Sequence, residues 1–285
     1  MPKISPLEFS VFSKYLFEIS GISLPKGKEY LFDTRLAPLL EEYRCFSFSE
    51  LYYKARRDNT LEEKIIDAIT TNETYFFRDI TPFELLQYKI LPDLIDRRSA
   101  GPTPRGKIPI RIWSAGCSTG QEVYSITFII DSLNLSESDY DIYILGTDIS
   151  NAAITKASYG AYSNFELSRG LKPDQIETYF TRINDNTLKI NDKFRWMVSF
   201  KTHNLFQKIP TSKQFDIVLC RNVGIYFSPQ DRKRLYRIIR SQLADDGYLL
   251  IGATESLTHD TDLFIPKKYL RAQFYQPNPD ASTNL

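Results

Sequence analysis

Residues 110–131, IRIWSAGCSTGQEVYSITFIID, place an apolar run, a loop of small residues and a helix-like stretch next to one another. The run predicts a buried strand, residues 114–120 a flexible loop and residues 121–131 a helix. A strand, a glycine-containing loop and a helix in this order let the backbone approach a nucleotide ligand closely. Gly116 and Gly120 are therefore candidates for close approach, although both could instead serve only a tight turn. The spacing is not GxGxxG and no phosphate-loop Lys-Ser/Thr pair follows, so a diphosphate is not the expected ligand.

Three later apolar runs have the same character as the run at Ile110–Trp113. They are Ile142–Leu145, Ile217–Cys220 and Tyr248–Ile251, and segments with helical character lie between most of them. Short, nearly continuous apolar runs are typical of strands buried on both faces of a mainly parallel sheet. The sequence therefore predicts an α/β domain with a Rossmann-like sheet. It follows a Gly- and Pro-rich stretch, Ser99–Pro109, which we interpret as a linker.

The chain before this linker predicts an all-α domain. Ser5-Pro6-Leu7-Glu8 is a capping box with proline at the first helical position. Similar signatures occur at Ser47–Glu50, Thr60–Glu63 and Thr81–Glu84. Apolar residues at helical spacing follow the first and the last of them: Phe9, Phe12, Leu16 and Ile19, then Phe83, Leu86, Ile90 and Leu94. We expect a helical domain over residues 1–90 and an α/β domain over residues 91–285.

Part of the second half departs from a strand–helix alternation. A helix is expected over about residues 173–180, and Leu188–Ile190 and Arg195–Lys201 alternate like strands around polar turns. This pattern predicts a small antiparallel β-subdomain inserted at about residues 166–200. Phe264–Tyr275 predicts late strands, and the last ten residues, QPNPDASTNL, predict a loose tail.

Composition narrows the class of protein. Lys and Arg total 36 and Asp and Glu total 35, so no global field attracts nucleic acid. The three cysteines are widely spaced, which is typical of reduced thiols in the cytoplasm, and two histidines without a CxxC pair argue against a metal site. The chain starts without a signal-like segment and has no apolar run of membrane-spanning length. We expect a cytoplasmic monomer that neither binds nucleic acid nor inserts into a membrane.

Polar residues follow the predicted strands, where ligands bind in open α/β sheets. Asp148 ends the run Ile144-Leu145-Gly146-Thr147 and could accept hydrogen bonds from ribose hydroxyls, or alternatively cap the next helix. Arg221 and Asn222 follow the strand expected at residues 215–220. Tyr226 lies close behind, either in the site or as a half-buried aromatic with a satisfied hydroxyl.

One further segment has the composition of a pocket wall. Residues 71–79, TNETYFFRD, surround three consecutive aromatic residues with an amide, two hydroxyls, two carboxylates and a guanidinium. Polar groups can fix a ligand there, while aromatic rings exclude water.

Together these segments resemble the CheR family of chemotaxis receptor methyltransferases. The matching motifs run in the family's order and cover nearly the whole chain: TNETYFFRD (71–79), IWSAGCSTGQEVYS (112–125), ILGTDIS (144–150), HNL (203–205), FDIVLCRNVGIYF (215–227) and GYLLIGATESL (247–257). The helical start also fits, with its Gly-Ile-x-Leu break after residue 20 and the pair Arg35-Leu36.

The resemblance implies methyl transfer from S-adenosylmethionine to glutamate side chains on the cytoplasmic helices of membrane chemoreceptors, with S-adenosylhomocysteine as product. It also implies the roles of individual residues. Carried over by position, Asn72, Thr74 and Arg78 line the methyl-transfer site, Glu122 and Asp148 bind the cofactor, and Asn204, Leu205, Arg221 and Asn222 surround its adenosine and methionine portions. Tyr226 is expected near the transferred methyl. We hypothesise that Arg78 and Tyr226 hold the substrate carboxylate or shape the site, and that Phe76 and Phe77 pack and exclude water.

The chain departs from the family pattern at a few positions. Val123 replaces a proline, Gly224 replaces a larger apolar residue, and Ala253-Thr254 replaces a His-Ser pair. Gly224 could loosen the loop that carries Tyr226. The hairpin near residues 184–195 is short, which suggests a member that does not depend on a receptor tail peptide. Alternative functions are a regulator that binds the cofactor without turnover and a methyltransferase for another protein. The glycine spacing disfavours a nicotinamide-dependent oxidoreductase.

Overall fold

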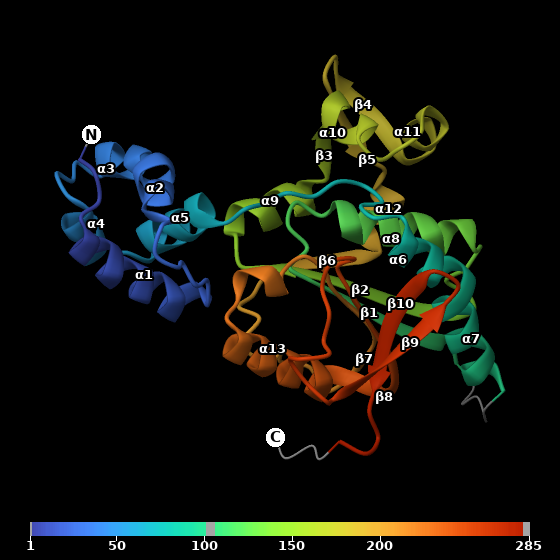
Figure 1. Cartoon of the computed structure of the whole chain (residues 1–285). Coiled ribbons are helices and arrows are strands. Elements are labelled where there is room, and N and C mark those ends of the chain that lie inside the picture. The colour runs from blue at the N-terminus through green and yellow to red at the C-terminus, as the bar shows by residue number, and fades with distance from the viewer. Residues whose placement is uncertain (1, 101–105, 282–285) are drawn as a thin grey trace.

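The computed structural model describes residues 2–100 and 106–281. Figure 1 shows a helical domain, in blue, joined by an extended segment to a larger α/β domain. The expected linker lies partly outside the described residues; its described ends finish one helix at Ser99 and begin a strand at Ile108. The expected loose tail is wrong at its start, because residues 276–277 belong to the last strand, and residues 282–285 lie outside the described part.

The helical domain is confirmed. Its helices are α1 (Pro6–Ser20), α2 (Glu29–Leu31), the π-helical η1 (Phe32–Leu36), α3 (Ala37–Glu42), α4 (Phe48–Ala55) and α5 (Asn59–Ile69). The capping box at Ser5 is present, and Gly21, at φ 77°, ends α1 in the left-handed conformation that glycine adopts readily. The core is aromatic: the ring of Phe32 packs edge-on against those of Phe9 and Phe12, each with centroids 5.3 Å apart.

Of the other three predicted caps, the structure confirms one and contradicts two. Ser47 caps α4 as predicted, because its side chain accepts from the backbone N–H of Glu50. The prediction at Thr60 is wrong: Asp58 caps α5 by accepting from the N–H groups of Thr60 and Leu61. Thr81 is also wrong as a cap, since it is the first residue of a helix that follows Ile80 and has no side-chain cap. A Thr-x-x-Glu pattern does not exclude a start one or two residues earlier.

A long helical stretch follows the extended segment and packs on the sheet. It comprises α6 (Thr81–Leu85), the π-helical η2 (Leu86–Ile90) and α7 (Leu91–Ser99). The predicted apolar face is confirmed, and it belongs to the core cluster that contains Ile110 and Ile112 of the sheet. The core of the helical domain, by contrast, ends with Ile69. A boundary at residue 90 therefore falls inside a helix of the sheet's core, and we propose that the helical domain closes near residue 69.

The α/β domain contains a seven-stranded sheet in the order β6-β2-β1-β7-β8-β10-β9. The strands are β1 (Ile108–Ala115), β2 (Tyr140–Asp148), β6 (Val198–Thr202), β7 (Phe215–Cys220), β8 (Leu243–Ile251), β9 (Phe264–Tyr269) and β10 (Ala272–Pro277). The first five are parallel, whereas β10 pairs antiparallel with β8 and β9. All four predicted core strands and the late strands are confirmed.

Both faces of this sheet are covered, as the apolar runs required. In β7, Ile217 and Leu219 face the cluster that contains α6–α7 and α8 (Gln121–Ser132), while Val218 and Cys220 face α13 (Pro229–Gln242). Helix α9 (Asn151–Tyr159) follows β2. The Rossmann-like α/β prediction is thereby confirmed.

The inserted β-subdomain exists, with different limits from those predicted. Its sheet is β3-β5-β4, formed by β3 (Ala161–Ser163), β4 (Phe180–Asn184) and β5 (Thr187–Ile190), together with α10 (Asn164–Ser168) and α11 (Pro173–Tyr179). It stands apart at the top of Figure 1. The prediction for Arg195–Lys201 is wrong: α12 (Asp192–Trp196) ends there, and β6 pairs parallel with β2 in the main sheet. An edge strand with one buried face alternates like a hairpin strand, so the pattern could not distinguish them.

None of the helices in the described part of the chain has the length and apolar character needed to cross a bilayer.

Candidate active site

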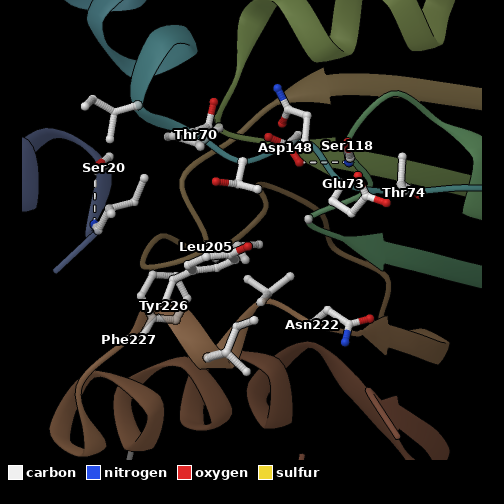
Figure 2. A pocket seen from close by; sticks show the side chains of 18 of the residues that line it. Ser20, Thr70, Glu73, Thr74, Ser118, Asp148, Leu205, Asn222, Tyr226 and Phe227 are labelled. Carbon is white, nitrogen blue, oxygen red and sulfur yellow. Dashed lines mark hydrogen bonds between the residues drawn. The ribbon is translucent and has the colours of Figure 1, made fainter. Parts of the chain in front are cut away.

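A cavity of about 510 Å³ lies between the helical domain and the carboxyl ends of the central strands. The residues directly after β1, β2 and β7 contribute to its wall, namely Gly116–Ser118, Ile149 and Arg221–Val223. Figure 2 shows Asp148 and Ser118 on one side of it and Tyr226 and Phe227 on the other. Its size and position are those of a site for one small molecule in an open α/β fold.

The glycine loop after β1 is tied to Asp148. One carboxylate oxygen of Asp148, Oδ2, accepts from the N–H of Ser118 at 2.8 Å, and the other, Oδ1, accepts from the N–H of Ser150 at 3.0 Å. Ser150, not Asp148, is the residue that caps α9. Asp148 lines the cavity with only 9% of its surface exposed. A carboxylate has about four lone-pair positions, so capacity remains for ribose hydroxyls.

The two glycines of the loop serve different purposes. Gly116 lines the cavity at φ 80°, and a side chain there would collide with Val223. Gly120, at φ 92°, does not belong to the cavity wall; an added Cβ would lie 2.8 Å from the Cβ of Ala157. Close approach to a ligand is therefore possible at Gly116, whereas Gly120 allows α8 and α9 to pack closely.

Burial raises the pKa of Asp148, while hydrogen bonds from the backbone of Ser150 and Ser118 act in the opposite direction. Hydroxyl donors from a ribose favour the ionised carboxylate, so a bound nucleoside lowers this pKa again. We therefore expect affinity for S-adenosylhomocysteine to fall as the pH drops through the raised pKa. The fall should begin at a higher pH than for an ordinary aspartate. Titration calorimetry from neutral pH down into the usual range of an aspartate measures it. Asp148→Asn should remove this step, and an unchanged profile in that variant would contradict the assignment.

Arg221 connects three segments beneath the cavity. Its side chain is 2% exposed; Nη1 donates to Oε2 of Glu122 at 2.7 Å, and Nη2 lies 3.2 Å from Oδ2 of Asp79. Nη2 also donates to the carbonyl of Arg78, and Oε1 of Glu122 accepts from the hydroxyl of Ser114. Glu122 and Arg221 both line the cavity. Arg221 therefore orients Glu122 and the loop after residue 77 as well as contributing to the wall.

The segment TNETYFFRD runs along the cavity as its composition predicted. Asn72, Thr74 and Arg78 line it, whereas Phe76 is fully buried in a separate aromatic cluster. Nη1 of Arg78 donates to the carbonyl of Glu73 at 2.6 Å. The guanidinium of Arg35 holds the start of the segment, donating to the carbonyls of Ile69 and Thr70 and to the Thr71 hydroxyl.

The loop after β7 is held from the motif GYLLIGATESL. Oε2 of Glu255 accepts from the N–H groups of Asn222 at 2.7 Å and Gly252 at 2.8 Å. Gly224 begins the short turn η3 (Gly224–Tyr226), where an added Cβ would lie 3.0 Å from Oε1 of Glu255. The turn is closely packed, so the absence of a side chain at Gly224 leaves no gap beside Glu255. Tyr226, 40% exposed, lines the cavity with Asn222.

Of the neighbouring residues Asn204 and Leu205, one lines the cavity and the other does not. Leu205 is buried and lines the cavity, whereas Asn204 does not belong to the wall. The Asn204 amide instead donates to the carbonyl of Ile19 at 3.3 Å, and its oxygen accepts from the N–H of Phe206. Asn204 thus links the α/β domain to the end of α1.

The helical domain supplies a wall that the motifs did not predict. Residues from the end of α1, the following loop, α2 and η1 line the cavity: Ser20, Ile22, Ser23, Leu24, Pro25, Lys28, Tyr30, Leu31 and Arg35. The only sequence signals for this wall were the Gly-Ile-x-Leu break and the Arg35-Leu36 pair, which carry no chemistry by themselves.

Backbone strain gathers in the segments around the cavity. Among the described residues, seven non-glycine residues have positive φ, and four of them are Phe77, Asp79, Ser118 and Asn222. Such conformations cost free energy and persist where the surroundings fix them, often at functional sites. Ser118 lines this cavity, while its side-chain hydroxyl is buried in the protein without a hydrogen-bond partner in the described chain.

The fold and the cavity define a Rossmann-like protein that binds a nucleoside cofactor. The family model described as "CheR methyltransferase, SAM binding domain" matches residues 72–271, and "CheR methyltransferase, all-alpha domain" matches residues 7–70. The chain belongs to the CheR methyltransferase family.

Three relatives illustrate the similarity. The chemotaxis protein methyltransferase of Vibrio parahaemolyticus is 38% identical, over 92% of this chain and 93% of its own. Chemotaxis protein methyltransferase 1 of Pseudomonas aeruginosa is 36% identical, over 90% of this chain and 92% of its own. The chemotaxis protein methyltransferase of Borreliella burgdorferi is 34% identical, over 95% and 94%.

Proposed function

We propose that this protein transfers a methyl group from S-adenosylmethionine to glutamate carboxylates on the cytoplasmic helices of bacterial chemoreceptors. The observation that carries the proposal is the cavity itself. Its wall draws on the segments that hold the family's motifs, with Asp148, Glu122, Arg78 and Tyr226 around one space. The names of the relatives, chemotaxis protein methyltransferases, support the same class of reaction.

The residues present fit this cofactor. Asp148 accepts one backbone hydrogen bond on each carboxylate oxygen and has lone pairs left for ribose hydroxyls. Glu122, although bonded to Arg221 and Ser114, can still accept from the cofactor's ammonium group. Gly116 permits the backbone to lie against the ligand.

The chemistry asks the protein mainly for alignment. When bound, S-adenosylmethionine supplies a methyl group on a sulfonium, whose sulfur is a good leaving group. A new C–O bond forms to the glutamate oxygen while the C–S bond breaks, and an ionised glutamate needs no general base. We assign Arg78 and Tyr226 to holding that carboxylate in line. Alignment of this kind lowers the activation free energy by several kcal/mol.

Exclusion of water is the second contribution. Charge disappears as the carboxylate and the sulfonium react, so removing water from both partners favours the reaction. Phe76 is fully buried behind the wall, and Phe77 packs edge-on against Phe83 at 5.3 Å between ring centroids. These rings pack behind the segment that carries Arg78 and exclude water from that side of it.

The direct test is methyl transfer from radiolabelled S-adenosylmethionine to chemoreceptor-containing membranes. We expect base-labile label on the receptor, and none on a receptor whose methyl-accepting glutamates are replaced with alanine. Tight binding of S-adenosylhomocysteine without any transfer would instead favour a cofactor-sensing regulator. Transfer to a soluble protein but not to receptors would favour a methyltransferase with another substrate.

A further inference from the structure

The helical domain and the α/β domain share a hydrogen-bonded contact outside the cavity. Asp67, on α5, lies against the first turn of α9. Its Oδ1 accepts from the hydroxyl of Ser150 at 2.7 Å and from the N–H of Ala152 at 3.2 Å. Ser150 itself caps the helix by accepting from the N–H of Ala153. The free N–H groups of α9 are thus divided between its own cap and a carboxylate from the other domain.

Ser150 connects Asp67 to Asp148, the residue whose carboxylate is assigned to cofactor binding. The N–H of Ser150 donates to Oδ1 of Asp148 at 3.0 Å, and the N–H of Ser118 donates to Oδ2 at 2.8 Å. Ser150 is fully buried, so no solvent competes for its two polar groups. Asp67 does not line the cavity, whereas Asp148 and Ser118 do.

We propose that Asp67 is a positioning residue for cofactor binding, which acts through Ser150 to hold the Asp148 carboxylate toward the cavity. The inference deepens the proposed function and rests on the role assigned there to Asp148. Two physical features favour it over a merely stabilising contact. The Ser150 hydroxyl can donate to only one acceptor, so Asp67 fixes the direction of its O–H bond. The negative charge of Asp67 also suits the N-terminus of α9.

The arrangement couples domain docking to cofactor affinity. Asp148 is held on both sides by backbone N–H groups, and one of the two belongs to the residue that Asp67 restrains. Without Asp67, Ser150 keeps its cap but loses the acceptor of its hydroxyl. Asp148 then samples orientations in which a ribose would no longer find both oxygens. Affinity for the nucleoside should fall, while the chemistry at the methyl group stays unchanged.

The test measures the Kd for S-adenosylhomocysteine by calorimetry on the full chain. Asp67→Ala should raise Kd about tenfold, the effect of losing one charged hydrogen-bond acceptor. Asp67→Asn keeps an acceptor oxygen and should stay within about threefold of the parent protein. Glu63→Ala is the matched control. Glu63 lies one turn earlier on α5 and, among the described residues, accepts only from the Asn151 amide at 3.4 Å, so its loss should leave Kd unchanged.

Two further measurements separate positioning from general damage. Steady-state kinetics of Asp67→Ala should show a raised KM for S-adenosylmethionine with kcat retained at saturation. In a double-mutant cycle with Ser150→Ala, the double variant should weaken binding by less than the sum of the two single variants, because both remove the Asp67–Ser150 hydrogen bond. Additive effects would overturn the route through Ser150.

Asp148→Asn distinguishes failure of the inference from failure of the site. If Asp148→Asn weakens binding and Asp67→Ala does not, the positioning role is wrong and the proposed function stands. If Asp148→Asn binds normally, the assigned role of Asp148 is wrong. Any effect of Asp67→Ala would then need another route, which also overturns the inference.

Discussion

Replacing Arg78 with alanine is expected to lower kcat for methyl transfer by about 100-fold while raising the Kd for S-adenosylhomocysteine far less. Arg78 lines the cavity, and its guanidinium is already steered by the carbonyl of Glu73. A carboxylate that loses this partner still enters the site but reaches the methyl group in line less often. Single-turnover methylation and calorimetry, run on the same preparation, measure the two quantities.

Arg169 provides the matched control for Arg78. It lies 4.8 Å over the ring of Tyr75 and pairs with Oε1 of Glu73 at 2.6 Å, yet it does not line the cavity. Arg169→Ala removes a similar cation that contacts the same segment from outside it, and kcat should stay within about threefold, as expected of a largely solvated ion pair. A normal turnover rate in Arg78→Ala would rule out its catalytic role.

Arg221→Met is expected to lower the free energy of unfolding by about 3–5 kcal/mol. The Arg221 side chain is 2% exposed and that of Glu122 13%, so removing the guanidinium leaves a buried carboxylate without its counter-charge. Glu122 stays near Ser114, which cannot replace a cation. Denaturant unfolding at constant slope measures the loss.

A second substitution and a control sharpen this prediction. Adding Glu122→Gln to Arg221→Met removes the stranded charge and should recover part of the stability. Arg240→Met is the control, because its partner Asp245 is 89% exposed and stays hydrated when released. Equal losses for Arg221→Met and Arg240→Met would show that the buried pair contributes nothing special.

Local patterns predicted the fold well in amphipathic helices and in fully buried strands. The strand Phe215–Cys220 is buried at every position, and a continuous apolar run announces such a strand. Helix starts were predicted less accurately. The sequence pattern placed the cap of α5 at Thr60, but the side chain of Asp58, two residues earlier, accepts from the first N–H groups of that helix. The strand Val198–Thr202 was misplaced because alternation reveals one buried face but not the sheet to which it belongs.

Some of the site residues could be predicted from the sequence, and others could not. Residues beyond the strand ends, such as Asp148 and Asn222, follow from the geometry of an open α/β sheet. Asn204 and Gly120 do not face the cavity, because a motif gives spacing and not the direction of a side chain. The contact between Asp67 and Ser150 joins residues 83 positions apart and depends on how two domains dock. No local pattern encodes such docking.

The wall formed by Ser20, Lys28 and Arg35 has a consequence for attempts to rewire specificity. In a chimaera that joins the helical domain of one relative to the α/β domain of another, the wall of the cavity would come from two different proteins. Swapping the first seventy or so residues to redirect target choice would therefore also reset how strongly the hybrid holds its methyl donor. Such hybrids need compensating changes along the seam between the halves before their selectivity can be compared.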